Sequence, residues 1–256
     1  MPHCVHLASD LHLGAPGYAS SVERERDFVR WMRDASRGEG FAQGAQATEI
    51  HLVGDVFDFW FEYRRAVPKG GVRLLGAIAE LVDEGMPVHY HVGNHDMWTF
   101  GYLEDELGVQ VHREPVLREW DGLTCLVGHG DGLGPGDRGY RRLKKIFTSR
   151  ACQAAFRLVH PDLGMALAHA WSAKSREKGE APLRDLSEEH LHSFAQAWLA
   201  DGSKPEVDVF VFGHRHLPLD VVVEGTHARY LNAGDWLTHK TSVVIANGEA
   251  KLLTHS

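Results

Sequence analysis

Five short apolar segments of this chain each end in Asp, Asn or His residues. The segment ends are Ser9-Asp10-Leu11-His12, Gly54-Asp55, Gly93-Asn94-His95-Asp96, Gly128-His129 and Gly213-His214-Arg215-His216. Short apolar runs bounded by turn residues are typical of buried β-strands. In an α/β protein, the residues just past the carboxyl ends of parallel strands meet at one edge of the sheet, where ligands bind. The sequence therefore predicts a ligand site built from strand ends.

The order of the expected elements favours an α/β fold. Strands are expected at residues 4–8, 49–53, 88–92, 123–127 and 207–212. Amphipathic helices are expected at residues 22–37 and 72–84, and the chain after residue 218 is rich in short strands with Gly turns. This order predicts a mixed β core flanked by helices. With 256 residues, the chain is long enough for one large domain, which we expect at residues 1–256.

A helical stretch at residues 137–201 interrupts this order between two expected core strands. From Arg138 to Arg157 it contains seven Lys and Arg residues and no Asp or Glu, although the whole chain has a formal charge of −8. Leu143 and Phe147 are spaced for one apolar helix face. The stretch is either a solvated helical hairpin packed on the core or a helical cap inserted into the domain. A cap with a basic, apolar underside would suit an anionic amphiphile or a membrane surface.

Composition narrows the classes of function. The charge of −8 argues against general affinity for nucleic acid, so we expect no nucleic-acid partner. The three Cys residues are odd in number and have no C-x-x-C spacing, which favours a reducing, cytoplasmic compartment. We expect neither a signal peptide nor a membrane-spanning helix, because no apolar run approaches the ~18 residues that a span needs. Histidine is unusually frequent, with 18 copies, and metal binding is a natural reason.

Seven side chains at the strand ends are of types that bind metal ions. They are Asp10, His12, Asp55, Asn94, His129, His214 and His216. Imidazole together with carboxylate and amide oxygens suits divalent ions such as Mn, Fe or Zn. Because the set exceeds what one ion needs, we expect two divalent ions that share the carboxylate of Asp55. Paired ions can clamp a phosphoryl group and lower the pKa of a bridging water.

In chain order these residues form the motifs D-x-H, G-D-x-x-D, G-N-H-D, G-H-G-D and G-H-x-H. The series resembles the calcineurin-like metallophosphoesterase superfamily and spans residues 10–216. The resemblance implies a four-layer α/β/β/α sandwich with two metal ions at its strand ends. It implies that the first ion takes Asp10, His12, Asp55 and His216, and the second Asp55, Asn94, His129 and His214. His95 would then be an acid or charge stabiliser near the scissile phosphate, with Asp96 orienting it.

A narrower resemblance accompanies the first. The segments S-D-L-H-L-G, G-D-V-F-D-F-W, H-G-D-G-L and N-A-G-D-W are similar to those of UDP-2,3-diacylglucosamine hydrolases. These enzymes use Mn, cleave the pyrophosphate of a UDP-linked lipid to lipid X and UMP in lipid A synthesis, and place a helical cap over the acyl chains. The resemblance implies that residues 137–201 form such a cap. The residues that it implies for substrate contact are Asn94, His95, Asp137, Tyr140, Ser172 and His214.

One position departs from the pattern of this narrower family. Many of its members read G-N-R-D, whereas His95 stands in the Arg position here, as in general phosphoesterases. Two alternatives therefore stay open: a metallophosphodiesterase or phosphatase with another, nucleotide substrate, and a non-catalytic scaffold, which would be expected to lack ligands. The lipid-nucleotide interpretation implies peripheral contact with the cytoplasmic face of the inner membrane. The sequence does not indicate an oligomeric state.

Overall fold

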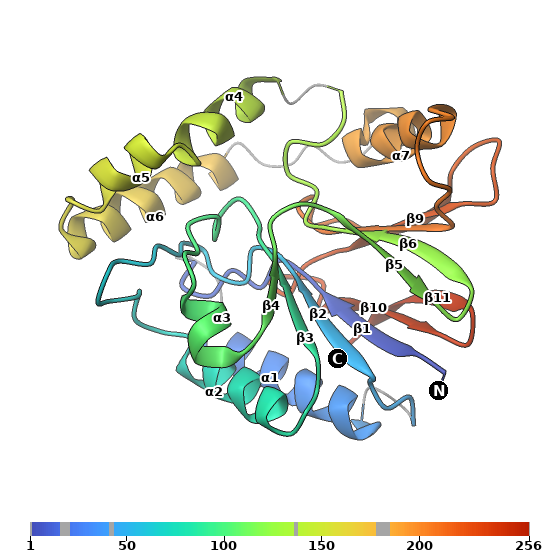
Figure 1. Cartoon of the computed structure of the whole chain (residues 1–256), viewed down its shortest axis with the longest axis horizontal. Helices are drawn as coiled ribbons and strands as arrows, with labels where there is room; N and C mark the ends of the chain where they lie inside the picture. Colours follow the sequence, from blue (N-terminus) through green and yellow to red (C-terminus); the bar gives the residue numbers. More distant parts are fainter. Residues whose placement is uncertain (1, 16–20, 41–43, 136–137, 178–184, 256) are drawn as a thin grey trace.

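The computed structural model describes residues 2–15, 21–40, 44–135, 138–177 and 185–255 (Figure 1). Its strands are β1 (Cys4–Ala8), β2 (Glu49–Val53), β3 (Val88–His91), β4 (Gln110–His112), β5 (Val116–Trp120), β6 (Leu123–Val127), β7 (Val209–Phe212), β8 (Pro218–Val222), β9 (Arg229–Ala233), β10 (Thr241–Ala246) and β11 (Glu249–Thr254). Its helices are α1 (Ser21–Arg37), α2 (Val72–Asp83), α3 (Tyr102–Leu107), α4 (Arg138–Phe147), α5 (Arg150–Phe156), α6 (Pro161–Glu177), a short 3-10 helix (Leu186–Glu188) and α7 (His190–Ala200). Across the described residues, no helix combines the length and the apolarity needed to cross a membrane.

Two mixed sheets form the centre of the molecule (Figure 1). The first has the strand order β11-β10-β1-β2-β3-β4, in which β1 to β4 are parallel. The second has the order β5-β6-β7-β9-β8, in which β6, β7 and β9 are parallel. The predicted α/β class with a mixed core is confirmed. Within each sheet, the parallel strands bring their carboxyl ends, and the residues that follow them, to one edge.

Successive side chains of each strand point to opposite faces of the sheet, so one strand contacts two different layers of the molecule. Ile50 and Leu52 of β2 belong to a buried cluster that includes Trp31 of α1. Val53 points to the opposite face, where it shares a cluster with Val211 of the second sheet. The two sheets therefore pack face to face through apolar side chains, and α1, α2 and α3 cover the outer face of the first sheet (Figure 1).

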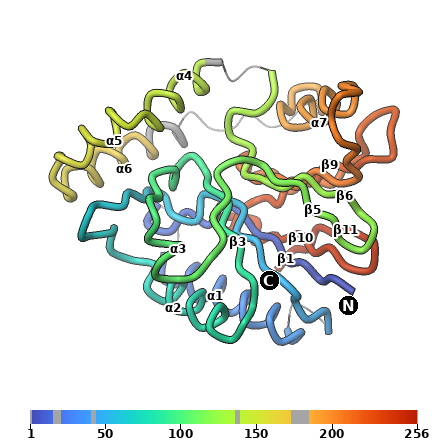
Figure 2. Tube along the Cα trace, in the orientation of Figure 1, coloured from blue at the N-terminus to red at the C-terminus, as the bar shows by residue number. Residues whose placement is uncertain are grey.

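The helical stretch that we expected to form one cap at residues 137–201 divides into two parts. Helix α7 packs on the outer face of the second sheet, where Leu191 shares a buried cluster with Phe210. Helices α4, α5 and α6 lie together at one edge of the molecule, away from α7 (Figures 1 and 2). They meet the core through Phe156, whose ring centroid is 4.6 Å from that of Trp98. Periodicity predicts an amphipathic helix but not the surface that covers it, so the sequence could not separate α7 from its neighbours.

Candidate metal centre

The ligand-type residues lie in tight turns after the strands, in backbone conformations that are uncommon for residues with a side chain. The angle φ is positive at Asp10 (55°), His12 (44°), Asp55 (50°), His214 (68°) and His216 (50°). Left-handed backbone of this kind costs roughly 1–2 kcal/mol in a residue other than glycine. It bends the chain sharply enough for two residues at i and i+2 to face one point. The fold therefore holds a local strain that a functional site would justify.

One cluster of ligand-type side chains is formed by Asp10, His12 and His216. Asp10 Oδ1 lies 3.0 Å from His216 Nε2 and 3.6 Å from His12 Nε2, and the two Nε2 atoms are 3.2 Å apart. Asp10 is buried, and the imidazoles of His216 and His12 are the polar groups that face its Oδ1. A carboxylate oxygen faced by two imidazole nitrogens in this way fits a shared divalent cation, whose ligands lie about 2.0–2.2 Å away.

A second cluster is formed by Asp55, His129 and His214. His129 Nε2 lies 3.2 Å from Asp55 Oδ2 and 3.2 Å from Asn94 Oδ1. Asp55 Oδ2 is also 3.7 Å from His12 Nε2, so this carboxylate lies between the two clusters. The structure thus brings together the seven strand-end residues that the sequence analysis selected. Two buried groups that meet at one carboxylate are consistent with a dinuclear metal site.

Hydrogen bonds from the backbone hold these ligands in place. His129 Nδ1 donates to a main-chain carbonyl of β2 at 2.9 Å, which leaves the lone pair of Nε2 facing Asp55. Asp10 Oδ2 accepts the backbone N–H of His214 at 2.9 Å, and Asp55 Oδ1 accepts that of His95 at 2.8 Å. In each carboxylate, one oxygen is thereby fixed by the protein and the other faces the imidazoles. Metal ligands are supported in this way by the groups behind them.

Without a metal ion, the clusters are coupled acid–base pairs. Burial alone would raise the pKa of Asp10, but His216 and His12 outweigh it and hold this pKa well below its usual range. Burial alone would lower the pKa of His12, but Asp10, Asp58 and Asp55 raise it to about 10. Protons on His12 and His216 therefore help to neutralise the carboxylates of the metal-free protein. Divalent ions would take the place of these protons, because a metal needs the imidazole lone pair.

His95 lies beside both clusters. Its Nδ1 donates to the main-chain carbonyl of Asp58 at 2.8 Å, so the ring turns Nε2 toward Asp55 Oδ2, 4.0 Å away. Its ring meets that of His12 edge-on, with centroids 4.7 Å apart. Burial lowers the pKa of His95, although Asp55 acts against this effect. The position suits a group that holds or moves a proton next to the metal ligands.

Asp96 differs from the orienting role that the resemblance implied. Its buried carboxylate accepts hydrogen bonds from Tyr90 Oη (2.6 Å), Gly93 N (2.7 Å) and Val56 N (2.9 Å). Burial and the nearby Asp55 raise its pKa to about 6. The described hydrogen bonds assign the His95 ring to the carbonyl of Asp58 and not to Asp96. Asp96 instead ties the turn after β3 to the turn after β2, because its oxygens are already satisfied there.

Asp58 is a site residue to which the sequence analysis assigned no role, although the G-D-x-x-D motif contains it. Its carboxylate lies 3.4 Å from His12 Nδ1. It also accepts a hydrogen bond from Ser172 Oγ at 2.9 Å and contacts His169 Nδ1 at 3.1 Å, both on α6. Asp58 therefore joins α6 to His12, a candidate metal ligand, while its carbonyl holds His95. No local pattern links Asp58 to His169, since 111 positions separate them.

A cavity of about 470 Å³ opens from the clusters toward α4, α5 and α6. Its polar end is lined by Asp58, Asn94, His95, Tyr140, Ser172 and His214. Its apolar wall is made by Phe59, Met97, Trp98, Leu143, Phe147, Cys152, Phe156, Leu167, Ala168 and Trp171. A single cavity thus combines candidate metal ligands with a large apolar surface, a composition typical of a ligand site.

The relatives of the chain agree with this geometry. No protein-family model matches it. It is 34% identical over 252 residues to the UDP-2,3-diacylglucosamine hydrolase of Porphyromonas gingivalis, which covers 94% of this chain and 93% of that protein. The chain belongs to the UDP-2,3-diacylglucosamine hydrolase family of metallophosphoesterases. It is also 29% identical over 234 residues to the hydrolase of the same name from Bordetella parapertussis, with 90% and 84% of the two chains covered.

Among solved structures, a phosphoesterase from E. coli aligns with 95% of this chain and 88% of that chain, at a TM-score of 0.45 and 14% identity. The membership in the hydrolase family rests on the sequence relatives and not on this likeness. The resemblance that the strand-end motifs indicated is thereby confirmed at the level of the family.

The resemblance implied six residues of this chain for substrate contact. Five of them line the cavity, namely Asn94, His95, Tyr140, Ser172 and His214. The Tyr140 hydroxyl donates to Asp131 at 2.7 Å, which fixes the ring at the cavity wall. Ser172 is only 2% exposed and donates to Asp58. Asp137 lies outside the described residues. Substrate contact by all six residues stays a prediction.

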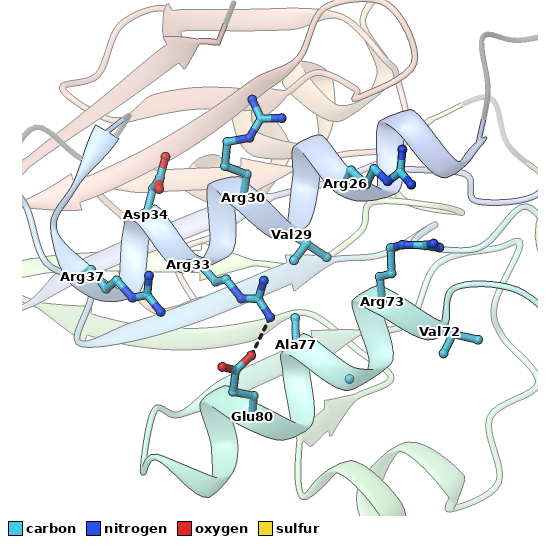
Figure 3. A pocket seen from close by; sticks show the side chains of 11 residues that line it. Arg26, Val29, Arg30, Arg33, Asp34, Arg37, Val72, Arg73, Ala77 and Glu80 are labelled. Atoms are coloured by element: carbon cyan, nitrogen blue, oxygen red, sulfur yellow. Dashed lines mark hydrogen bonds and ion pairs between the residues drawn. The ribbon is translucent and has the colours of Figure 1, made fainter.

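A wider groove of about 630 Å³ lies between α1 and α2. Figure 3 shows arginines of both helices along it: Arg26, Arg30, Arg33, Arg37 and Arg73. Arg33 pairs with Glu80 at 2.7 Å. The residues that line the groove include no histidine, and their only carboxylates are Asp34 and Glu80. Despite its size, this groove is lined by none of the seven strand-end residues.

Asp55→Asn is expected to lose both metal and activity, because an amide cannot provide the anionic oxygen shared by the two clusters. Metal ions contribute several kcal/mol to phosphoryl transfer, so hydrolysis of an aryl phosphodiester with Mn²⁺ should fall by at least ~100-fold. Metal content is measured by mass spectrometry and the rate by absorbance. Asp83→Asn, at the exposed end of α2, is the matched control and should keep both. Similar rates for the two variants would remove Asp55 from its bridging role.

His95→Ala should lower the rate by about 10²–10⁴-fold, the usual contribution of a positioned acid or base. Its metal content should stay near that of the wild type, because no ligand of either cluster is changed. The same mass spectrometric measurement checks this point. A variant that loses metal would show that His95 is itself a ligand, and the role proposed for it would be wrong.

Proposed function

We propose that this chain hydrolyses the pyrophosphate bond of UDP-2,3-diacylglucosamine and releases UMP and lipid X, a step of lipid A synthesis. The observation that carries the proposal is the single cavity in which the strand-end ligands meet an apolar wall. A lipid nucleotide has the two matching parts, a charged pyrophosphate and acyl chains. The names of the relatives from P. gingivalis and B. parapertussis support the same substrate.

Cleavage of a phosphoryl bond needs an in-line nucleophile, neutralised phosphate oxygens and a stabilised leaving oxygen. Bound to the two clusters, a pair of divalent ions would neutralise the phosphate oxygens and activate water. We propose Mn²⁺ for both positions, with Fe and Zn as ions that the same nitrogen and oxygen donors accept. His95 presents Nε2 to the cavity because its Nδ1 is bound to Asp58. When protonated, this nitrogen donates a hydrogen bond to the leaving oxygen. If UMP is the leaving group, its low basicity makes this hydrogen bond sufficient, without full transfer of the proton.

The acyl chains are assigned to the apolar wall of the cavity, most of which is formed by α4, α5 and α6. We call these three helices together the cap. Leu143, Phe147 and Trp171 are contributed by α4 and α6 to this wall. Each methylene buried there contributes about 0.8 kcal/mol, so a few carbons more or less change the affinity strongly. The cap is held near the metal ligands by the contacts of α6 with Asp58. Its position fits a lipid-binding role better than that of a hairpin packed on the core.

Peripheral contact with the cytoplasmic face of the inner membrane is part of the proposal. Large apolar side chains of the cap and its loops are exposed, namely Ile146 (57%), Leu158 (90%), Leu163 (56%) and Leu167 (57%). The exposed cations Arg142 and Lys145 lie on α4, and Arg150 lies on α5. A basic residue near an anionic membrane contributes about 1 kcal/mol. Such a surface would bring the cavity to a membrane-bound substrate.

The proposed function is tested by incubating the Mn²⁺-loaded protein with UDP-2,3-diacylglucosamine and measuring the release of UMP by chromatography. Rapid release of UMP, with little hydrolysis of an aryl phosphodiester, is the expected result. Efficient hydrolysis of the aryl phosphodiester without release of UMP would favour a phosphodiesterase or phosphatase with another substrate. Hydrolysis of neither substrate by protein that holds metal would favour a non-catalytic scaffold.

Replacing Phe147 and Trp171 with Ser should raise KM for the lipid nucleotide by at least ~10-fold, because two large apolar side chains leave the wall. The rate with the aryl phosphodiester should not change. Lys144 is not a suitable target, since it pairs with the buried Asp131 at 2.7 Å and its loss would disturb that site. Val222→Ser, 60% exposed on β8, is the control. Equal losses on both substrates would mean that the cap has only a structural role.

A further inference from the structure

A separate group of metal-ligating side chains lies between the two sheets, away from the strand-end turns. Glu49 and His51 belong to β2, and His89 of β3 is the register partner of His51. Ile50 and Leu52 of β2 face the helices, so Glu49 and His51 face the second sheet. The group shares no residue with the two clusters at the strand ends.

Three ligand atoms converge in this group. Glu49 Oε2 lies 3.2 Å from His51 Nε2 and 3.0 Å from His89 Nε2. The three ligand atoms lie within 4.8 Å of one another. Two donors bound at 2.0–2.1 Å to one tetrahedral zinc ion are about 3.3–3.4 Å apart. The distances from the Glu49 oxygen to the two imidazoles already approach that spacing.

Both imidazoles have a partner behind them, as histidine ligands of metals do. His51 Nδ1 lies 2.9 Å from His91 Nε2, and His89 Nδ1 lies 2.9 Å from His112 Nε2. If both Nδ1 atoms carry the proton and donate it to these neighbours, both Nε2 lone pairs are left toward the Glu49 carboxylate. His91 and His112 can therefore accept the two Nδ1 protons when an ion takes both Nε2 lone pairs.

We propose that Glu49, His51 and His89 form a third metal site that binds Zn²⁺. Two imidazoles and one glutamate are a donor set that zinc accepts, with its fourth position left for water. Trp120 of β5 donates to Glu49 Oε1 at 2.5 Å, so the ion links β2 and β3 to the second sheet. The Glu49 side chain is 14% exposed and that of His51 is fully buried, which places the entry of the ion at the Glu49 side.

The charge states of these residues suit a metal. Burial lowers the pKa of His51 to about 4, although Glu49 acts against it. Burial also lowers the pKa of His112 to about 4 and holds that of His91 well below its usual range. Burial would raise the pKa of Glu49, but His51 and His89 lower it, so the carboxylate is ionised.

Binding requires a small rearrangement of the rings. His51 and His89 are stacked with centroids 4.3 Å apart and planes inclined by 14°, so their lone pairs run nearly parallel. A shared ion needs one ring to turn about its Cβ–Cγ bond toward the other. Without an ion, N–H groups of both rings donate to Glu49 instead. The two states differ in metal content and in ring environment, and both quantities can be measured.

The first experiment is to dialyse the full chain against Zn²⁺ at pH 7 and count bound zinc by mass spectrometry. The wild type should hold three equivalents, whereas Glu49→Gln and His89→Gln should each hold two. His255→Gln is the matched control, because His255 is also buried and bonds Ser242 outside all three clusters. It should hold three equivalents. Two equivalents in the wild type, or three in both site variants, would overturn the proposal.

A second measurement needs no variant that might fail to fold. The Hε1 resonances of His51 and His89 are followed by NMR while the wild type takes up its third equivalent of Zn²⁺. Both resonances should shift with that equivalent, and Co²⁺ in its place should give a visible absorption band of a tetrahedral site. Unchanged resonances throughout the titration would show that the group is a hydrogen-bonded pair of imidazoles on a carboxylate, and that no zinc binds there.

Discussion

The carboxylate of Asp55 joins the two sheets of this molecule at their strand ends. It follows β2 of the first sheet and lies 3.2 Å from His129, which follows β6 of the second. A buried carboxylate is unfavourable unless positive charge or hydrogen bonds compensate it. Burial would raise the pKa of Asp55, but His129 and His95 outweigh it and lower this pKa. The strand ends thus concentrate negative charge that protons or metal ions must balance, and the fold keeps that charge in place.

The interface between the sheets makes this arrangement rigid. On one side it is apolar, where Leu7 of β1 and Val211 of β7 belong to the same buried cluster. Because protein interiors are close-packed, such a core fixes the distance between the strand ends of the two sheets. On the other side the same interface is polar, where Glu49 meets His51 and His89. The histidines of the chain therefore gather in two places. One is the group of turns after the strands, and the other is this polar part of the interface between the sheets.

The sequence predicts the strands and the ligand types of the strand-end site because both are local features. An apolar run and the ligand residue after it are neighbours in the chain, and parallel pairing then gathers the ends. Contacts between distant positions could not be predicted in this way. Asp58 meets α6, and Asp96 is satisfied by backbone groups of two turns, so their roles needed the structure. Likewise, the histidines of E-I-H-L-V and V-H-Y-H are visible as alternation, but their contact depends on the β2–β3 register.

Asp58 connects the cap to the chemistry of the metal centre. Ser172 and His169 of α6 contact its carboxylate, which also lies 3.4 Å from His12, while its carbonyl holds the ring of His95. A hydrogen bond to a charged acceptor contributes about 1.5–3 kcal/mol, enough to hold α6 in place but not to lock it. Because functional groups must be positioned within about 0.5 Å, contacts that hold α6 against Asp58 also bear on the position of His95. Asp58 therefore reaches the two clusters in two ways, through its carboxylate at His12 and through its carbonyl at His95.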